Sequence, residues 1–290
     1  MICCVFDETA RVAATTEQRR LIINADDFGL APGVNAGIVE AHCAGAVTST
    51  SMMVRCPGWS DALARLPNAP RLGVGLHFNL LLGTPLTRAA SLIDTRTGDF
   101  RPLGLLVQRS LLGVVRMADI ESECEAQLDA LRGAGVVPTH IDSHRHTHAL
   151  PVIRNAVARV AVHHKLPLRR PKESLRHFAT DLPAVVKRAI VSTAWTLTSI
   201  AAPRTPSTDH FTGIALQGAT DFERRLTLVL GDLPRGTSEV MVHPGHVDQT
   251  LEAIDGYTAP RERELAALTS AGVLRALRVS TIRRITFAEL

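Results

Sequence analysis

Short apolar runs alternate with longer stretches of helical periodicity along most of the chain. Runs of this kind predict strands, and the stretches between them, several bounded by Pro, Gly or Asp, predict helices. Strands are expected at Leu21–Ile23, Ser49–Val54, Gly73–Asn79, Thr139–Ser143, Leu166–Arg170, 210–214, 239–243 and 281–285. Helices are expected at Pro32–His42, 57–66, 119–132, Val152–His164, 182–199, 221–230 and 261–277. The alternation predicts an α/β fold with parallel strands, TIM-barrel-like and incomplete or distorted.

The chain of 290 residues contains no convincing linker, so residues 19–290 are expected to form a single domain. Residues 1–18 have no periodic apolar pattern and are expected to be a loose leader. Residues 80–115 are rich in Gly, Leu and Arg without a clear period, and they are expected to form a long excursion or lid.

Composition narrows the functional classes. The net charge is only +4, and eight Phe, two Trp and one Tyr leave few rings for stacking on bases, which disfavours nucleic-acid binding. The longest uncharged run, Ala189–Pro203, is too short and too polar for an integral membrane segment. Five cysteines without C-x-x-C spacing, and Asp7 and Glu8 where a secretory signal is apolar, favour a cytoplasmic protein with reduced thiols.

Several polar residues lie where a predicted strand ends, which is where parallel α/β folds build their sites. Asp26 and Asp27 follow the first strand, His77 lies in the third, and His243 ends the strand at 239–243. Neighbouring carboxylates on a strand point to opposite sides and should have different partners. Taken singly, the aspartate pair also fits a turn or helix cap, His77 a core histidine and His243 a turn.

Residues Thr139–His148 contain four of the chain's 12 histidines. In an extended chain His140, Asp142 and His144 share one face, and imidazole with carboxylate suits zinc and other first-row divalent ions. A polar surface loop accounts for His146 and His148 but not for the alternation of aspartate and histidine. The pattern therefore favours a metal site.

Together these groups match metal-assisted hydrolysis. Two histidines and a carboxylate would hold the cation, a second carboxylate would take a proton from the attacking water, and a histidine would protonate the leaving group.

Four segments of the chain resemble the YdjC family of carbohydrate deacetylases. They are Asn24–Leu30, Gly75–Phe78, Thr139–His144 and His243–Gly245, and the similarity runs from about Leu21 to near the C-terminus. The resemblance implies a TIM-barrel-like fold and removal of acetyl from an N-acetylated sugar, such as an N-acetylglucosamine-containing oligosaccharide or glycoconjugate. It also implies one divalent metal ion, usually magnesium, which activates the water nucleophile.

By the same resemblance the metal ligands would be Asp27, His77 and His144. Asp26 would be the general base, and His243 would be the acid that protonates the departing amine. Candidate contacts to the sugar are Phe78, Arg145, His146, His210 and Phe211.

The chain departs from the family at Arg145, where the family's chitooligosaccharide deacetylase has histidine. An arginine here fits an anionic or differently decorated sugar, or only solvent. The basic run Arg169, Arg170, Lys172 and Arg176 fits a phosphate or lipid head group, but such a run is more often a solvated face, which is the favoured interpretation.

Other classes stay open at this point. A site of two histidines and one aspartate also suits a metal-dependent phosphoesterase, and a non-catalytic sugar-binding relative would keep the same barrel. Magnesium rests on the resemblance alone, because two imidazoles favour zinc, cobalt or nickel. A homodimer is also left open.

Overall fold

The computed structural model describes residues 19–174, 182–198, 202–278 and 281–290. Residues 1–18, expected to be a leader, lie outside the described residues, as does Arg176.

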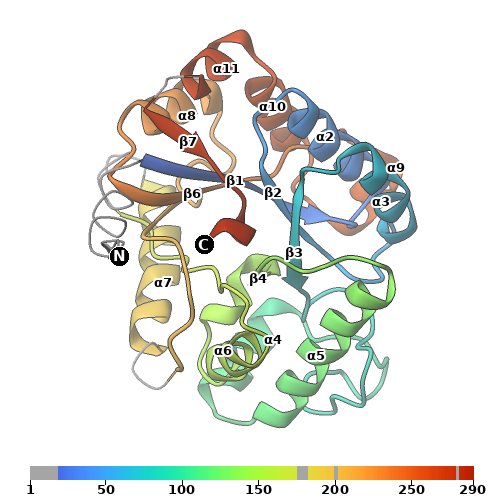
Figure 1. Cartoon of the computed structure of the whole chain (residues 1–290). Helices are drawn as coiled ribbons and strands as arrows, with labels where there is room; N and C mark the ends of the chain where they lie inside the picture. Colours follow the sequence, from blue (N-terminus) through green and yellow to red (C-terminus); the bar gives the residue numbers. More distant parts are fainter. Residues whose placement is uncertain (1–18, 175–181, 199–201, 279–280) are drawn as a thin grey trace, which may run out of the picture.

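A curled, parallel β-sheet forms the centre of the molecule, with helices around its outside (Figure 1). The strand order is β4-β3-β2-β1-β6-β5, and β7 pairs with β1. Among the described residues the strands are β1 (Arg19–Phe28), β2 (Ser49–Met52), β3 (Gly73–Phe78), β4 (Ile141–Ser143), β5 (His210–Thr212), β6 (Gly236–Val242) and β7 (Ile282–Arg284). All pairings between these strands are parallel, so the expectation of an incomplete TIM-barrel-like α/β fold is confirmed.

The helices largely follow the predicted periodic segments. They are α2 (Pro32–Cys43), α3 (Trp59–Arg65), α4 (Leu103–Leu111), α5 (Met117–Gly133), α6 (Ile153–His163), α7 (Leu182–Thr198), α8 (Phe222–Gly231), α9 (Gln249–Ile254), α10 (Ala259–Leu268) and α11 (Ala271–Leu277). Among the described residues no helix is long and apolar enough to cross a membrane.

The single helix expected at 261–277 is wrong. The hydroxyl of Ser270 accepts a hydrogen bond from the backbone N–H of Val273, so it caps a new helix, and the segment divides into α10 and α11.

The strand expected at Leu166–Arg170 is also wrong. This segment makes one isolated bridge to β4, between Leu168 and Ile141, and Glu173 makes another to Phe211 of β5. Pro167 and Pro171 have no N–H to give to a ladder. Residues 166–173 therefore span the gap between the two edges of the sheet without becoming a strand.

The segment expected to be an excursion contains one helix, α4, and one antiparallel bridge between Ile93 and Phe100. The carboxylate of Glu123 on α5 accepts hydrogen bonds from the backbone N–H groups of Leu86 and Thr87. These contacts anchor the first part of the excursion to the helical layer.

Candidate active site

A cavity of about 450 Å³ opens where four strands end. Asp26 and Asp27 reach it from β1, His77 from β3, His144 from the turn after β4 and His243 from the end of β6. These five side chains come from positions as far apart as 217 residues, and the shared carboxyl edge of the sheet brings them together.

The backbone of β1 explains how neighbouring aspartates reach one cavity. Asp27 has a φ of +73°, in the left-handed region, and the register between β1 and β2 shifts between Ala25 and Phe28. On a regular strand the two carboxylates would point to opposite faces. The bulge turns both into the cavity, while their partners still differ.

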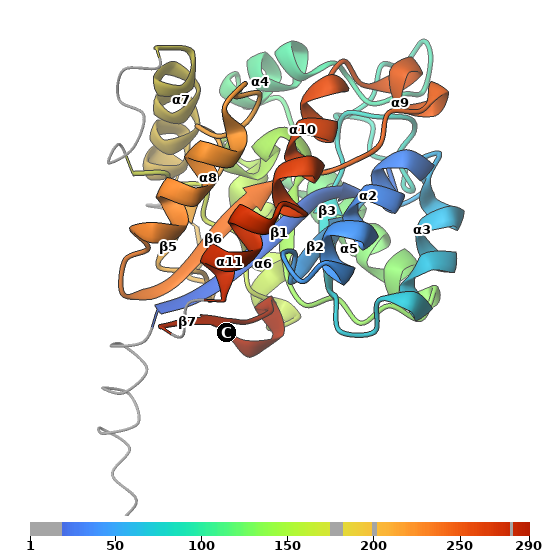
Figure 2. The ribbon, with the colours of Figure 1, turned by 90° about the horizontal axis from the view of Figure 1, so that it is seen from above.

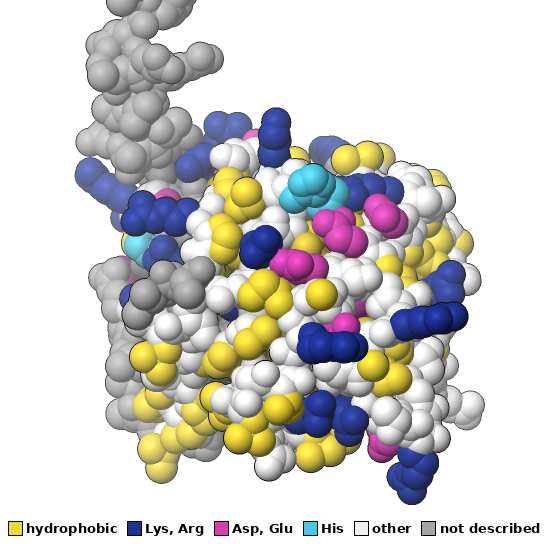
Figure 3. All heavy atoms as spheres, turned by 90° about the horizontal axis from the view of Figure 1, so that it is seen from below, with side chains coloured by type: hydrophobic (Ala, Val, Ile, Leu, Met, Phe, Trp, Pro, Cys, Tyr) yellow, Lys and Arg dark blue, Asp and Glu magenta, His cyan; other side chains and the backbone are white. Residues whose placement is uncertain are grey.

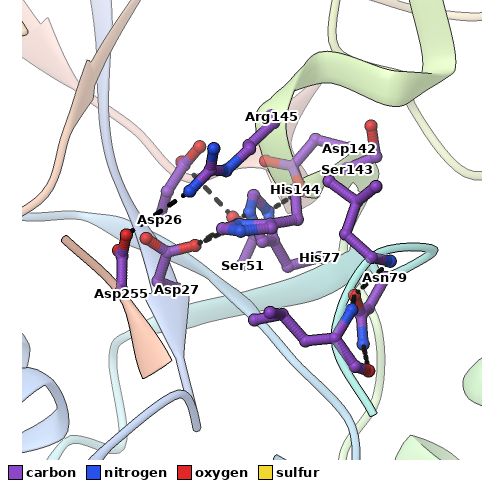
Figure 4. A network of polar contacts seen from close by, with 12 residues as sticks. Asp26, Asp27, Ser51, His77, Asn79, Asp142, Ser143, His144, Arg145 and Asp255 are labelled. Carbon is purple, nitrogen blue, oxygen red and sulfur yellow. Dashed lines mark hydrogen bonds and ion pairs between the residues drawn. The ribbon is translucent and has the colours of Figure 1, made fainter. Parts of the chain in front are cut away.

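Asp27, His77 and His144 form a cluster whose ligand atoms all lie within 4.8 Å of one another (Figure 4). Oδ1 of Asp27 lies 2.9 Å from Nδ1 of His144 and 3.2 Å from Nε2 of His77. All three side chains are buried. A carboxylate and two imidazoles converging on one point are a donor set that fits a divalent cation.

Asp142 orients His77 from the side away from the cluster. Nδ1 of His77 lies 2.6 Å from Oδ1 of Asp142, and both groups are buried. A carboxylate behind a histidine fixes the tautomer and leaves the other ring nitrogen for a metal ion. Asp142 therefore supports the cluster from behind.

The carboxylates around the cluster stabilise positive charge within it. Burial opposes the charged form of His77, but Asp142 and Asp27 outweigh it and raise the pKa of His77 to about 10. Burial likewise opposes the charged form of Asp27, but Arg261 and His144 hold the pKa of its carboxyl well below its usual value. Asp27 is thus ionised, as a metal ligand has to be.

Asp26 is held by a fully buried arginine. Both carboxylate oxygens of Asp26 accept hydrogen bonds of 2.6 Å from Arg169, which also contacts Glu239 at 2.6 Å and Asp142 at 2.8 Å. Burial alone would raise the pKa of Asp26, but Arg169 outweighs burial and lowers it. Asp26 is therefore an ionised carboxylate facing the cavity and can accept a proton.

Arg261 holds Asp27 in a similar way. Nη2 of Arg261 lies 2.6 Å from Oδ2 of Asp27 and 2.8 Å from Oδ2 of Asp255. The second oxygen of Asp27 is thus occupied, so Oδ1 is the one turned toward the two histidines.

His243 is fixed through its backbone. Its N–H donates to Oε2 of Glu264 at 2.6 Å, and Oε1 of the same carboxylate accepts from the hydroxyl of Tyr257 at 2.6 Å. The rings of His243 and Tyr257 meet edge to face, with centroids 5.5 Å apart. In the sheet order, β6 lies on the other side of β1 from β3 and β4. His243 therefore borders the cavity from the side opposite His77 and His144.

The structure separates the residues predicted to contact the sugar. Arg145 and His146 border the cavity. Phe78 is buried in the core, and His210 and Phe211 line a neighbouring cavity of about 400 Å³. The ring of Phe211 lies 5.9 Å from that of His146, which borders the first cavity.

The interpretation of the basic run as a solvated face is wrong for Arg169, which is fully buried, while Arg170 and Lys172 are exposed. Arg169 follows an apolar run and lies at the same end of the sheet as Asp26. Its position directly after an apolar run was the sequence signal that could have placed it in the site. Arg261, at the start of a predicted helix, had no comparable signal.

The interpretation of His148 as part of a polar surface loop is wrong. His140 was expected to share a face with Asp142 and His144, but it does not reach the metal cluster. His148 is buried between the hydroxyl of Ser143 and the carbonyl of Arg169. His140 stacks on Phe287 at 3.8 Å. Burial lowers the pKa of both histidines to about 3, so both are neutral and structural.

Comparison with known proteins gives consistent results. The model of the family described as YdjC-like protein matches residues 20–279. A carbohydrate deacetylase of Geobacillus stearothermophilus is 33% identical over 273 residues, which cover 93% of this chain and 98% of the relative. A chitooligosaccharide deacetylase of Yersinia pestis (strain Pestoides F) is 34% identical, with coverage of 87% and 92%.

A crystal structure from Enterococcus faecalis V583, named as a cellobiose-phosphate cleavage protein, is also similar. It has a TM-score of 0.76 and 26% identity, and the match covers 94% of this chain and 98% of that one.

Proposed function

The chain belongs to the YdjC-like family, and on that premise we propose that it is a carbohydrate deacetylase that removes the acetyl group from an N-acetylated sugar. The observation that carries the proposal is the convergence of Asp26, Asp27, His77, His144 and His243 on one cavity. These groups supply a cation site, a proton acceptor and a proton donor within one site.

One divalent cation would be held by Asp27, His77 and His144. When bound, such an ion lowers the pKa of water and stabilises negative charge that develops on the amide oxygen. The family resemblance supports magnesium, whereas two imidazoles among three ligands support zinc, cobalt or nickel.

Asp26 would act as the general base. Its carboxylate is ionised and faces the cavity, and the two hydrogen bonds from Arg169 fix its orientation. Asp26 would take a proton from the water that attacks the acetyl carbon.

His243 would act as the general acid. Hydrolysis of the amide releases acetate and an amine, and the amine has to be protonated as its bond to the acetyl carbon breaks. The backbone contact with Glu264 holds His243 at the cavity edge for this transfer.

Arg145 and His146 would bind the sugar. Both have φ values above +50°, which turn two consecutive side chains to the cavity, and Arg145 is only loosely held, 3.5 Å from Asp255. Phe78 is enclosed by the core and His210 lies outside the cavity, so neither is included in the proposed sugar site. A cytoplasmic location and a homodimer stay predictions from the sequence.

The test is acetate release from N,N′-diacetylchitobiose by metal-stripped protein, with Mg²⁺, Zn²⁺, Co²⁺ or Ni²⁺ added singly. We expect release only with metal, and the most effective ion identifies the preference of the site. Metal binding is measured in parallel on Asp27→Ala, His77→Ala and His144→Ala, each of which should lower occupancy. Hydrolysis of an aryl phosphate without acetate release would instead assign the site to a phosphoesterase.

A further inference from the structure

Two helices beside the cavity carry an unusual number of exposed apolar side chains. Among the described residues, twelve large hydrophobic side chains are strongly exposed, and eight of them lie on α4, the turn after it, or α7. On α4 and its turn they are Leu105, Leu111, Leu112 and Val114, and on α7 they are Leu182, Val186, Ile190 and Leu197. We call these eight side chains the apolar rim.

Helix α7 is apolar on two faces. Its inner face packs through Val191 and Trp195, and the ring of Trp195 lies 3.3 Å from the guanidinium carbon of Arg154. Its outer face carries Val186, Ile190 and Leu197, which are 48%, 64% and 68% exposed. A helix that is apolar on both faces requires a second apolar environment beyond its own core.

The apolar rim borders the mouth of the candidate active site. Leu103 of α4 and Ile190 of α7 both line the cavity. Figure 2 shows α7 and α4 toward the same margin of the molecule, and in Figure 3 hydrophobic side chains gather at the lower left. The two helices that carry the rim thus both reach the mouth of the cavity.

The charges within these segments have one sign. Residues 100–118 contain Arg101, Arg109 and Arg116 and no Asp or Glu, and α7 contains Lys187 and Arg188 and no Asp or Glu. Arg116 and Lys187 are exposed, although Arg116 also pairs with Asp119 just beyond the segment at 3.1 Å, and Arg188 is buried. Apolar side chains flanked by cations are the pattern of helices that lie in the interface of an anionic bilayer.

A second copy of the chain fits this face less well. A symmetric dimer built on the apolar rim would bring the same basic residues of two copies together, and like charges oppose such an interface. An anionic bilayer supplies both the apolar layer and the opposite charge.

We propose that the apolar rim docks the protein on the surface of an anionic lipid bilayer, with the mouth of the cavity turned toward it. The outer side chains of α4 and α7 enter the boundary between head groups and acyl chains, and the flanking cations contact the lipid phosphates. Docking requires neither the metal nor catalysis, so it stands apart from the proposed deacetylase activity.

The test is co-sedimentation of the full-length protein with phosphatidylcholine vesicles, with and without about 30% phosphatidylglycerol. We expect binding to the anionic vesicles, weakened by salt. The variants Leu111→Asp/Leu112→Asp and Val186→Asp/Leu197→Asp should each lower the partition coefficient about tenfold or more. The matched control Val137→Asp/Leu228→Asp changes two exposed apolar residues outside the rim and should bind like the wild type.

None of these substituted residues lines the cavity, so circular dichroism and acetate release from a soluble sugar check that each variant is folded. Wild-type protein that stays in the supernatant with anionic vesicles would overturn the proposal. So would rim variants that bind as well as the control, or a wild-type dimer that dissociates in the rim variants without any vesicle binding. If the wild type binds vesicles but releases no acetate, the proposed function fails and the docking surface stands.

Discussion

Asp26 and Asp27 show how two adjacent residues of one type acquire different partners. Asp26 is paired with Arg169 through both oxygens, and Asp27 divides its two oxygens between Arg261 and the histidine pair. Each carboxylate is ionised in a buried site because an arginine lies beside it. The role proposed for each therefore follows from its partner and not from its own chemistry.

Asp26→Asn should slow acetate release by about 100-fold or more while the metal stays bound, because an amide cannot accept the proton and Asp26 is not in the ligand cluster. Steady-state kinetics and metal analysis of the same sample measure the two effects. Glu239→Gln is the matched control, since it removes another carboxylate partner of Arg169 away from the cavity. Full activity in Asp26→Asn would show that another group is the base.

Asp142→Ala should lower metal affinity by about 10–100-fold, the usual cost of losing the group behind a ligating histidine. His77 would lose the acceptor on Nδ1 that fixes its tautomer. Competition with a chromogenic chelator measures the affinity, and Glu239→Gln again controls for loss of a partner of Arg169. Equal affinities in Asp142→Ala and wild type would exclude this orienting role.

At the scale of elements, α2 positions the loop that carries His243. A Cβ on Gly37 of α2 would lie 2.6 Å from the Cα of Gly245, two residues beyond His243. Only glycine allows the helix and the loop to approach this closely.

Gly37→Ala should therefore push the loop away, lower the free energy of unfolding by about 1–3 kcal/mol and reduce kcat. Urea unfolding and acetate release at saturating substrate measure the two quantities. Gly133→Ala at the end of α5, where a Cβ meets nothing within 4 Å, should leave both nearly unchanged. An unaltered kcat in Gly37→Ala would mean that the loop tolerates the shift.

At the scale of the whole molecule, a buried glutamate in the segment that closes the curled sheet makes the free energy of unfolding depend on pH. Glu173 ends the segment that spans the gap, and its carboxylate accepts hydrogen bonds from the backbone N–H groups of Gly213 and Ala215, just after β5. Burial outweighs these bonds and raises the pKa of Glu173 from its ordinary 4.5 to about 7.

Because the folded pKa lies above the unfolded one, the unfolded chain ionises first as the pH rises. The free energy of unfolding should then fall between pH 4.5 and 7, by about 3 kcal/mol at most from this group, and stay level above that. In Glu173→Gln this part of the decrease should vanish, while the part from Glu239, whose pKa is also raised to about 7 by burial, remains. Urea unfolding at pH 5 and pH 8 gives the comparison, and identical slopes in the two proteins would contradict it.

Much of the fold was predictable because its signals are local. Hydrophobic periodicity placed most of the helices and strands, and the rule that sites lie at the carboxyl ends of parallel strands singled out Asp26, Asp27 and His77. Prediction from periodicity failed where the local pattern disagrees with the position of the segment in the fold. At Leu166–Arg170 the apolar residues resemble a strand, but the prolines prevent a ladder of hydrogen bonds.

The sequence by itself determined the α/β class, the family and the five residues that meet in the cavity, because periodicity and motifs are properties of neighbouring positions. Only the tertiary structure decided that Arg169 reaches Asp26 across 143 positions and Arg261 reaches Asp27 across 234. It also decided that Val186, Ile190 and Leu197 on the outer side of α7 are exposed within the part of the chain that the structure describes. Such pairings depend on how the sheet curls and which helix face it buries, and both are set by packing of the whole chain, which no short segment encodes.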